Sequence, residues 1–434
     1  MRFLVAVAAV AVLIPRPLRY VKATLLCGAL AAFLAAGLLQ LGAFRGLDGM
    51  LATFLGRPAP PSGDRGLQFF LVLLFSFGIA WTTIDVGRLA QKGGIAFAAI
   101  AETITSVWVL NLYGAFFSPF ASLLAIALAF GFGVGYAQTS AGRRKRTLHQ
   151  LLGDRVSPRT FHSLLNSNEP LRFDGEVREA SVVVCELFNH DELVAALRIP
   201  DYVAMTNAFL RNAADFLVER GGYLDECDGE SLRVVFGAPM SEPRHAPRAC
   251  EAALELAERL DEVNLECLTV WGHRFDFRIG VNSGEMVMAA YGSSRLGAFS
   301  VTGEPVEFSR RLCAANTIYG SRVLISAGTF AYAEDSIEVR PMELIQRFRE
   351  EPDREEVYEL LGRRGTLSPR ESERRDIFWK AIVFYRERRW DEALEAFREC
   401  LVEHPTDGPA QFYVRRIEQI RAGLPALDFN AAKP

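Results

Sequence analysis

Cysteine and histidine, the side chains most often used as nucleophiles and transition-metal ligands, are scattered through this sequence of 434 residues. The seven cysteines include no Cys-x-x-Cys pair, and the six histidines do not cluster. This distribution fits reduced, packed thiols better than a disulfide framework or a zinc site. Carboxylates are grouped instead, since the segment Asp225–Glu230 carries four of them.

The segments around these carboxylates alternate between strand-like and helix-like patterns over Arg178–Gly362. Ala180–Cys185 is a continuous valine-rich run, as expected for a buried strand, and Leu232–Phe236 and Phe277–Val281 are similar. Ala249–Val263 has the spacing of an amphipathic helix. The alternation predicts an α/β sandwich in which helices pack on one sheet.

Three stretches carry a more specific resemblance: REASVVVCEL (178–187), ERGGYLDECDGESLRVVFGAP (219–239) and FRIGVNSGEMVMAAYGSSRLGAFSVTGEPVEFSRRL (277–312). In order, spacing and strand pattern they resemble the class III adenylate/guanylate cyclase domain. RVSPRTFHSLL (155–165) resembles the helix that precedes this domain in membrane-bound bacterial members. The resemblance implies a ferredoxin-like α/β cyclase domain over residues 178–363, after a connector at 141–177.

In that family two Asp carboxylates hold two Mg²⁺ or Mn²⁺ ions, which bind the triphosphate and activate the ribose 3′-OH for attack on the α-phosphate. The site forms between two chains, so the resemblance implies a homodimer or a heterodimer. The metal positions fall on Glu186 and Glu230, each one methylene longer than Asp. Because Mg²⁺ tolerates little geometric error, we expect the tight metal site to be lost.

The ribose-orienting Asn of the family falls on Glu307, whereas its transition-state Arg is present as Arg311. An Arg over the developing phosphate charge contributes strongly to phosphoryl transfer. Glu307 places a negative charge one helical turn away from it. We favour an i,i+4 ion pair between the two on a helix.

The positions that recognise the purine fall on Glu226, where adenylate cyclases have Lys, and on Ala298, where they have Asp. This pair is incompatible with adenine and weakly compatible with guanine. The phosphate loop is replaced by Phe188–His190, which contains no Gly. Arg347 and Arg349 lie near the position of the triphosphate-binding Lys.

Without well-held metals, the carboxylates expected around this pocket repel a triphosphate. They are Asp225, Glu226, Asp228, Glu230, Glu186 and Glu307. The sequence therefore predicts a cyclase-homology signalling protein with impaired catalysis, a pseudoenzyme that acts as a dimerising signalling or assembly subunit. The alternative is an active cyclase that converts GTP or ATP to the 3′,5′-cyclic nucleotide and pyrophosphate, since both metal positions remain carboxylates and Arg311 is kept.

Residues 1–140 are nearly all apolar, and 141–434 carry most of the charge. The apolar part predicts a multi-pass α-helical membrane domain that contacts lipid. Its expected spans are Ala23–Phe44, Leu67–Ile84, Ile95–Tyr113 and Phe120–Ala137. A fifth stretch, Phe3–Ile14, is short and is either a first span, an interfacial helix or a signal-like segment.

The basic run 143–146 follows the last span, which places the C-terminal domains in the cytoplasm and the protein in the bacterial inner membrane. The loop Arg45–Gly66 then lies outside. Glu102, in the middle of a span, is either a functional carboxylate or a packing residue.

A connector helix pair around Ser157-Pro158 presents an apolar stripe, either to a second chain or to the following domain. At the other end, residues 364–423 resemble a tetratricopeptide (TPR) unit in a short α-helical tail, followed by an extended C-terminus at 424–434. One such repeat cannot bury its own apolar face, so the tail either binds a protein partner or caps the preceding domain. The mildly acidic net charge of −4 gives no support for nucleic-acid binding.

Overall fold

The computed structural model describes residues 18–56, 65–85, 89–113, 116–139, 147–167, 173–292, 297–346 and 354–424. It divides into two compact units, which are Met1–Gln150 with Phe161–Asn168, and Leu151–Thr160 with Glu169–Pro434. The expected first apolar segment Phe3–Ile14, the basic run 143–146 and the chain from 425 onward lie outside the described residues.

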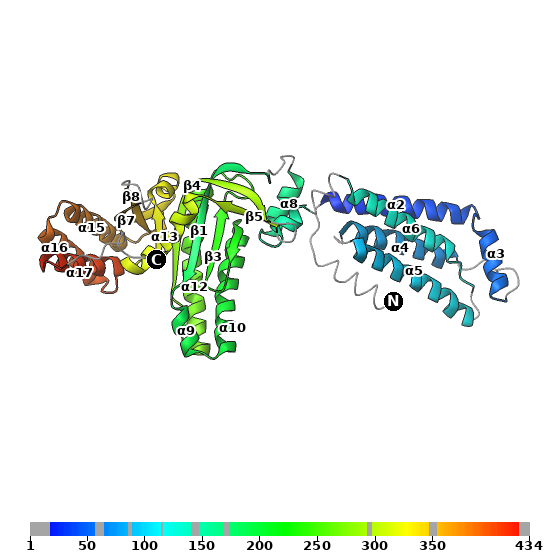
Figure 1. Cartoon of the computed structure of the whole chain (residues 1–434), viewed down its shortest axis with the longest axis horizontal. Coiled ribbons are helices and arrows are strands. Elements are labelled where there is room, and N and C mark those ends of the chain that lie inside the picture. The colour runs from blue at the N-terminus through cyan, green and yellow to red at the C-terminus, as the bar shows by residue number, and fades with distance from the viewer. Residues whose placement is uncertain are drawn as a thin grey trace. The chain divides into compact units, whose positions relative to one another are not determined.

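The N-terminal unit contains, among the described residues, four helices long and apolar enough to cross a membrane. They are α2 (Leu18–Gln40), α4 (Arg65–Asp85), α5 (Leu89–Leu112) and α6 (Phe120–Ala137), drawn in blue and cyan in Figure 1. Small residues let these helices approach closely, because a Cβ on Gly133 would overlap Thr83 of the neighbouring helix. The four spans expected from the sequence are therefore present as helices.

The expected loop Arg45–Gly66 is in part a helix, which corrects the sequence interpretation. Helix α3 covers Arg45–Phe54. Apolar residues recur every three or four positions at Leu47, Leu51 and Phe54, which is the spacing of one helical face. The Gly and Pro content of the segment concealed this pattern.

In the C-terminal unit, the described residues form one eight-stranded sheet in the order β2-β3-β1-β4-β6-β8-β7, with β5 paired to β4. Neighbouring strands are antiparallel except β4 and β6, which are parallel. The strands are β1 (Glu176–Leu187), β2 (Tyr223–Cys227), β3 (Ser231–Phe236), β4 (Phe277–Gly292), β5 (Gly297–Thr302), β6 (Val323–Ser326), β7 (Ile337–Gln346) and β8 (Arg354–Arg363). The mixed sheet confirms the expected α/β class.

Helices cover both faces of this sheet. On one face α12 (His245–Trp271) and α10 (Ile199–Leu210) pack on alternate residues of β1, such as Val183 and Cys185. On the other face α13 (Glu304–Tyr319) packs on β4 (Figure 1). The shorter helical segments are α8 (Pro158–Asn166), α9 (His190–Ala196), the π-helix η1 (Arg211–Asp215), α11 (Phe216–Glu219) and α14 (Ala327–Ala333).

The connector helix α8 begins as the sequence predicts. The Ser157 hydroxyl accepts a hydrogen bond from the Thr160 amide at 3.1 Å, so Ser157 caps the helix and Pro158 occupies its first position. Before it, Arg155 contacts the sheet: its carbonyl accepts from the Leu224 amide at 2.9 Å, and its guanidinium donates to the Asp225 carbonyl at 3.1 Å. This part of the connector is therefore fixed to β2.

The C-terminal tail consists of three helices, α15 (Pro369–Arg386), α16 (Trp390–Glu403) and α17 (Gly408–Arg421). Their apolar side chains share one buried cluster with α13, β6, β7 and β8, in which Phe378 and Phe397 of the tail pack with Phe308 and Leu312 of α13. The inner face of the tail is thus buried within the chain, and only its outer face is exposed for a partner.

A buried ion triad joins the tail to the sheet. Arg340 on β7 donates to Glu359 on β8 at 2.6 Å and to both carboxylate oxygens of Asp407 at 2.7 and 3.0 Å. Asp407 also caps α17 by accepting from the Ala410 amide at 3.1 Å. Burial acts to raise the pKa of Asp407, but Arg340 and the capping hydrogen bond hold that pKa below its ordinary value.

We expect Asp407→Asn to cost about 3 kcal/mol in the free energy of unfolding, because Arg340 would keep a buried charge without its bidentate partner. Thermal unfolding of the full chain in detergent micelles, followed by tryptophan fluorescence, should show a lower midpoint. Asp391→Asn is the matched control, since its ion pair with Arg421 lies on the surface. Equal losses in the two variants would contradict a role for the triad in docking the tail.

Candidate active site

The side-chain alternation of the strands decides which residues share the face covered by α13. On β1, Val184 lies opposite Gly280 of β4 and opposite Arg233 of β3. Glu186, two residues after Val184, points to the same face. In the β2–β3 hairpin Glu226 lies opposite Arg233, so Glu226 joins this face as well.

Helix α13 lies directly on β4 because Gly280 has no side chain. A Cβ at this position would overlap the Ser309 carbonyl and the Cys313 amide of the helix. The buried Asn316 fixes the other end of the contact by donating to the Ile279 carbonyl at 2.9 Å, and it accepts from the Ser321 hydroxyl at 2.8 Å. These contacts set where α13 presents its arginines.

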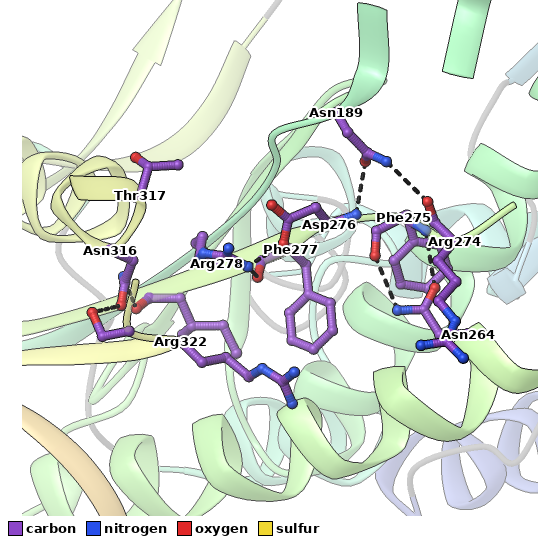
Figure 2. A network of polar contacts seen from close by, with 12 residues as sticks. Asn189, Asn264, Arg274, Phe275, Asp276, Phe277, Arg278, Asn316, Thr317 and Arg322 are labelled. Carbon is purple, nitrogen blue, oxygen red and sulfur yellow. Dashed lines mark hydrogen bonds and ion pairs between the residues drawn. The ribbon is translucent and has the colours of Figure 1, made fainter. Parts of the chain in front are cut away.

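Two more asparagines hold the beginning of β4 (Figure 2). The Asn264 amide on α12 bonds both the N–H and the carbonyl of Phe275 at 3.0 Å. The Asn189 amide accepts from the Asp276 N–H at 2.7 Å and donates to the Arg274 carbonyl at 2.9 Å. The segment Phe188–His190, where the family has its phosphate loop, is therefore bound to the chain's own backbone.

The second expected metal position, Glu230, is engaged by a neighbouring histidine. Its carboxylate lies 2.9 Å from His190 Nε2, and its carbonyl accepts from the Leu187 amide at 2.8 Å. Asp228 closes the same turn by accepting from the amides of Glu230 and Ser231 at 2.9 and 2.6 Å. Burial acts to raise the pKa of Asp228, but these hydrogen bonds outweigh it and hold that pKa below its ordinary value.

The first expected metal position, Glu186, is half-buried at the end of β1. Burial raises the pKa of its carboxyl, the Arg310 guanidinium lowers it, and Asp228 raises it further; the net pKa lies above the ordinary value. The charges of Arg310 and Asp228 therefore both act on the Glu186 carboxyl.

Two arginines that the sequence analysis did not single out bind carboxylates of this site. The Glu226 carboxylate binds Arg310 at 2.6 Å and Arg233 at 2.8 Å through the same oxygen. Arg233 also binds the buried Asp225 at 2.6 Å. The strand register shifts between Leu224 and Glu226, which lets the consecutive residues Asp225 and Glu226 both contact Arg233. The expected cross-strand pairing in the hairpin could have pointed to Arg233 from the sequence. No comparable sequence signal points to Arg310.

Arg311 lies away from this cluster. Its guanidinium donates to the Gln346 carbonyl on β7 at 2.7 Å and lies over the Phe308 ring at 5.7 Å from the centroid. Glu307 is exposed in the first turn of α13, where a carboxylate interacts favourably with the helix N-terminus. The expected Glu307–Arg311 ion pair is not formed among the described side chains, because the helix presents Arg311 towards β7.

The remaining expected nucleotide contacts are apolar or lie outside the described residues. Ala298 is half-buried on β5, opposite Tyr291 of β4. Strand β5 contacts β2 through the Val301 amide, which donates to Asp225 at 3.3 Å. Arg347 and Arg349 lie outside the described residues.

The donor set does not fit a two-metal centre. Across the described part of the chain, no group of three or more His, Cys, Asp and Glu side chains is arranged to hold a metal ion. Of the carboxylates at this site, Glu230 pairs with His190, and Asp225 and Glu226 pair with arginines. These three carboxylates therefore already contact side chains of their own domain.

The family model described as the adenylate and guanylate cyclase catalytic domain matches residues 176–347. This segment belongs to the class III adenylate/guanylate cyclase family. The match begins at the first residue of β1 and ends just beyond β7, so it contains Glu186, Glu230 and Arg311.

Curated relatives match part of the chain. Adenylate cyclase 1 of Rhizobium meliloti (strain 1021) is 24% identical over 165 residues, which are 38% of this chain and 25% of that protein. An uncharacterized protein of Mycobacterium tuberculosis (strain ATCC 25618 / H37Rv) is 28% identical over 204 residues, 46% of this chain and 34% of that protein. The match thus spans between a quarter and about a third of the length of each relative. Among solved structures, guanylyl cyclase Cya2 is 25% identical, covering 45% of this chain and 97% of its own, with a TM-score of 0.41.

Replacing Gly280 tests the contact that positions α13 on the cyclase sheet. We expect Gly280→Ala to lower the free energy of unfolding by about 3 kcal/mol, because the added methyl group meets backbone atoms that cannot rotate away. Thermal unfolding of the full chain in micelles measures the effect. Gly229→Ala is the control, since a Cβ there meets nothing within 4 Å; a similar loss in the control would argue against a specific contact.

Proposed function

We propose that this chain is a membrane-anchored cyclase-homology protein that does not turn over nucleotide and acts as a dimerising signalling or assembly subunit. The observation that carries the proposal is the engagement of Glu230, the second metal position, by His190 at 2.9 Å. A carboxylate that ligates a divalent ion in the family here pairs with a side chain of its own domain. The first position, Glu186, experiences the charge of Arg310 as well as that of Asp228.

The pocket for the base supports the same conclusion. Glu226 is the residue that would accept hydrogen bonds from guanine, but both Arg310 and Arg233 bind its carboxylate. Ala298 offers no polar atom in its side chain at the second base position. Binding of GTP in the manner of the family would require Glu226 to exchange two charge-assisted contacts for hydrogen bonds to the base.

An active cyclase that uses GTP remains the competing hypothesis, and Arg311 is the residue that favours it. For catalysis its guanidinium must leave the Gln346 carbonyl and reach a phosphate held by a second chain. Glu230 must also release His190. Each of these rearrangements breaks an existing contact. The free energy of metal and nucleotide binding would have to compensate for the loss of all these contacts together.

The proposed place of the chain in a membrane follows from the four apolar helices, with the basic run 143–146 on the cytoplasmic side of a bacterial inner membrane. The cyclase domain and the tail would then lie in the cytoplasm. The partner would be a second copy of this chain or a related cyclase domain, and the outer face of the tail would be available to a further protein.

Product formation is the direct test. We expect the full chain, purified in detergent, to form no cyclic nucleotide from ATP or GTP with Mg²⁺ or Mn²⁺ over a wide range of protein concentrations. Mass spectrometry quantifies the product, and an active class III cyclase in the same detergent serves as positive control. Product from the unmodified chain that disappears in Arg311→Ala would establish the competing hypothesis.

Self-association is tested separately from catalysis. We expect two differently tagged copies of the full chain, expressed together, to be purified together in detergent. Mixing the two copies after separate purification controls for association inside shared micelles. Recovery of only one tag would contradict a homodimer and direct the search to a different partner chain.

A further inference from the structure

We propose an acid-sensitive switch at the beginning of α12: uptake of a proton by His245 breaks a chain of buried hydroxyl groups and loosens this end of the helix from the sheet. The switch goes beyond the proposed function, because it operates whether or not the cyclase domain turns over nucleotide.

The hydroxyl chain consists of Ser181 on β1, Ser283 on β4 and Thr329 on α14, all of them buried. Ser181 and Ser283 lie opposite each other in the sheet, and their hydroxyl oxygens are 2.6 Å apart. Thr329 donates to Ser283 at 3.0 Å. At the other end, the Ser181 hydroxyl lies 2.8 Å from Nδ1 of His245, the first residue of α12. Consecutive hydrogen bonds thus join two strands and two helices.

The direction of these hydrogen bonds makes His245 the acceptor at the end of the hydroxyl chain. Each hydroxyl group has one proton to donate. Because Thr329 donates to Ser283, the proton of Ser283 is available to Ser181. The proton of Ser181 is then available to Nδ1 of His245. In this arrangement the imidazole is neutral and carries its proton on Nε2.

The surroundings of His245 oppose a positive charge on its imidazole. The residue is 5% exposed, and it lies in the first turn of α12, where the helix dipole disfavours a cation. A protonated imidazole would also donate at Nδ1, so the Ser181 proton would lose its acceptor. Burial lowers the pKa of His245, the charges of Glu179 and Glu242 raise it, and the net pKa lies below the ordinary value.

The charged groups around this imidazole have partners of their own. Glu179 on β1 accepts from the hydroxyl of Tyr332 on α14 at 2.6 Å, and the Tyr332 ring lies 5.3 Å from the imidazole between ring centroids. The hydrogen bond to Glu179 raises the pKa of Tyr332 to about 12, with a further contribution from Glu285 on β4, so Tyr332 stays neutral. Glu242, just before α12, binds Arg248 at 2.6 Å. His245 is therefore the group of this cluster that titrates near neutral pH.

The sign of the pH dependence follows from the lowered pKa. In the unfolded chain His245 takes up a proton at about pH 6.5, whereas the folded chain takes it up only at lower pH. Between these two values the unfolded state binds more protons, so stability is present above about pH 6.5 and is lost as the pH falls below it. Once the folded chain is protonated, the broken hydrogen bond to Ser181 loosens the first turn of α12.

Thermal unfolding of the full chain in micelles, followed by tryptophan fluorescence at pH 7.5 and pH 5.5, tests the switch. We expect the midpoint of the unmodified chain to be lower at pH 5.5. His245→Gln keeps an oxygen that can accept from Ser181 but does not titrate, and we expect its midpoint to fall by a few degrees less between the two pH values. His404→Gln is the matched control, since this histidine is exposed in the tail, and it should behave as the unmodified chain.

Ser181→Ala distinguishes a switch from a purely structural contact. Without the Ser181 hydroxyl the neutral imidazole loses its donor, so protonation costs less. We expect a lower midpoint at pH 7.5 together with a smaller difference between pH 7.5 and pH 5.5. The control is Ser309→Ala, which removes an equally buried hydroxyl outside the hydroxyl chain and should lower the midpoint equally at both pH values.

Hydrogen exchange followed by mass spectrometry locates the change in the chain. After correction for the intrinsic exchange rate at each pH, we expect the first turns of α12 to exchange several-fold faster at pH 5.5 than at pH 7.5 in the unmodified chain. Peptides from α17 in the tail serve as the internal reference.

Two results would overturn the inference: the same pH dependence in the unmodified chain and in His245→Gln, or no acid-induced increase of exchange at the beginning of α12. The second result needs no substitution, so it holds even if the variant does not fold. Neither result bears on product formation, so the switch and the proposed function can fail independently.

Discussion

The contact between α13 and β4 at Gly280 is the constraint on which the rest of the C-terminal unit depends. Because Gly280 has no side chain, the backbone of α13 packs directly on the strand near Ser309 and Cys313. In this position the helix presents Arg310 to Glu226, and it presents Phe308 and Leu312 to the tail. A single close approach thus joins the sheet, the candidate site and the C-terminal helices.

Electrostatic balance within the cyclase domain is achieved by protein groups. The pocket pairs its acids with Arg310, Arg233 and a histidine, and the tail is attached through the buried Arg340 and its two carboxylates. The Arg340 triad is the buried cluster of the two: such a cluster stabilises little relative to apolar packing, but breaking it leaves an uncompensated charge. It therefore specifies how the tail docks on the sheet.

A cyclase sheet with an altered site is physically reasonable because different residues maintain the fold and the chemistry. The apolar side of β1, with Val183 and Cys185, packs under α12 and does not depend on what occupies the opposite face. Substitution at Glu186 or Glu230 changes the ligands while the core is preserved. The asparagines that hold β4, Asn264 and Asn316, likewise fix the backbone whether or not a nucleotide binds.

The sequence by itself determined the apolar spans, the valine-rich strands and the family resemblance, because hydrophobic periodicity is local and the motifs are contiguous. It did not determine the helix α3 within an expected loop, nor the partners of Glu307 and Arg311. Those depend on which face of a helix meets which strand. Only the tertiary structure decided that Arg310, 84 residues away from Glu226 in the chain, lies beside it. Long-range charge pairing has no local signature, since from the sequence alone either arginine of α13 is an equally plausible partner of Glu226.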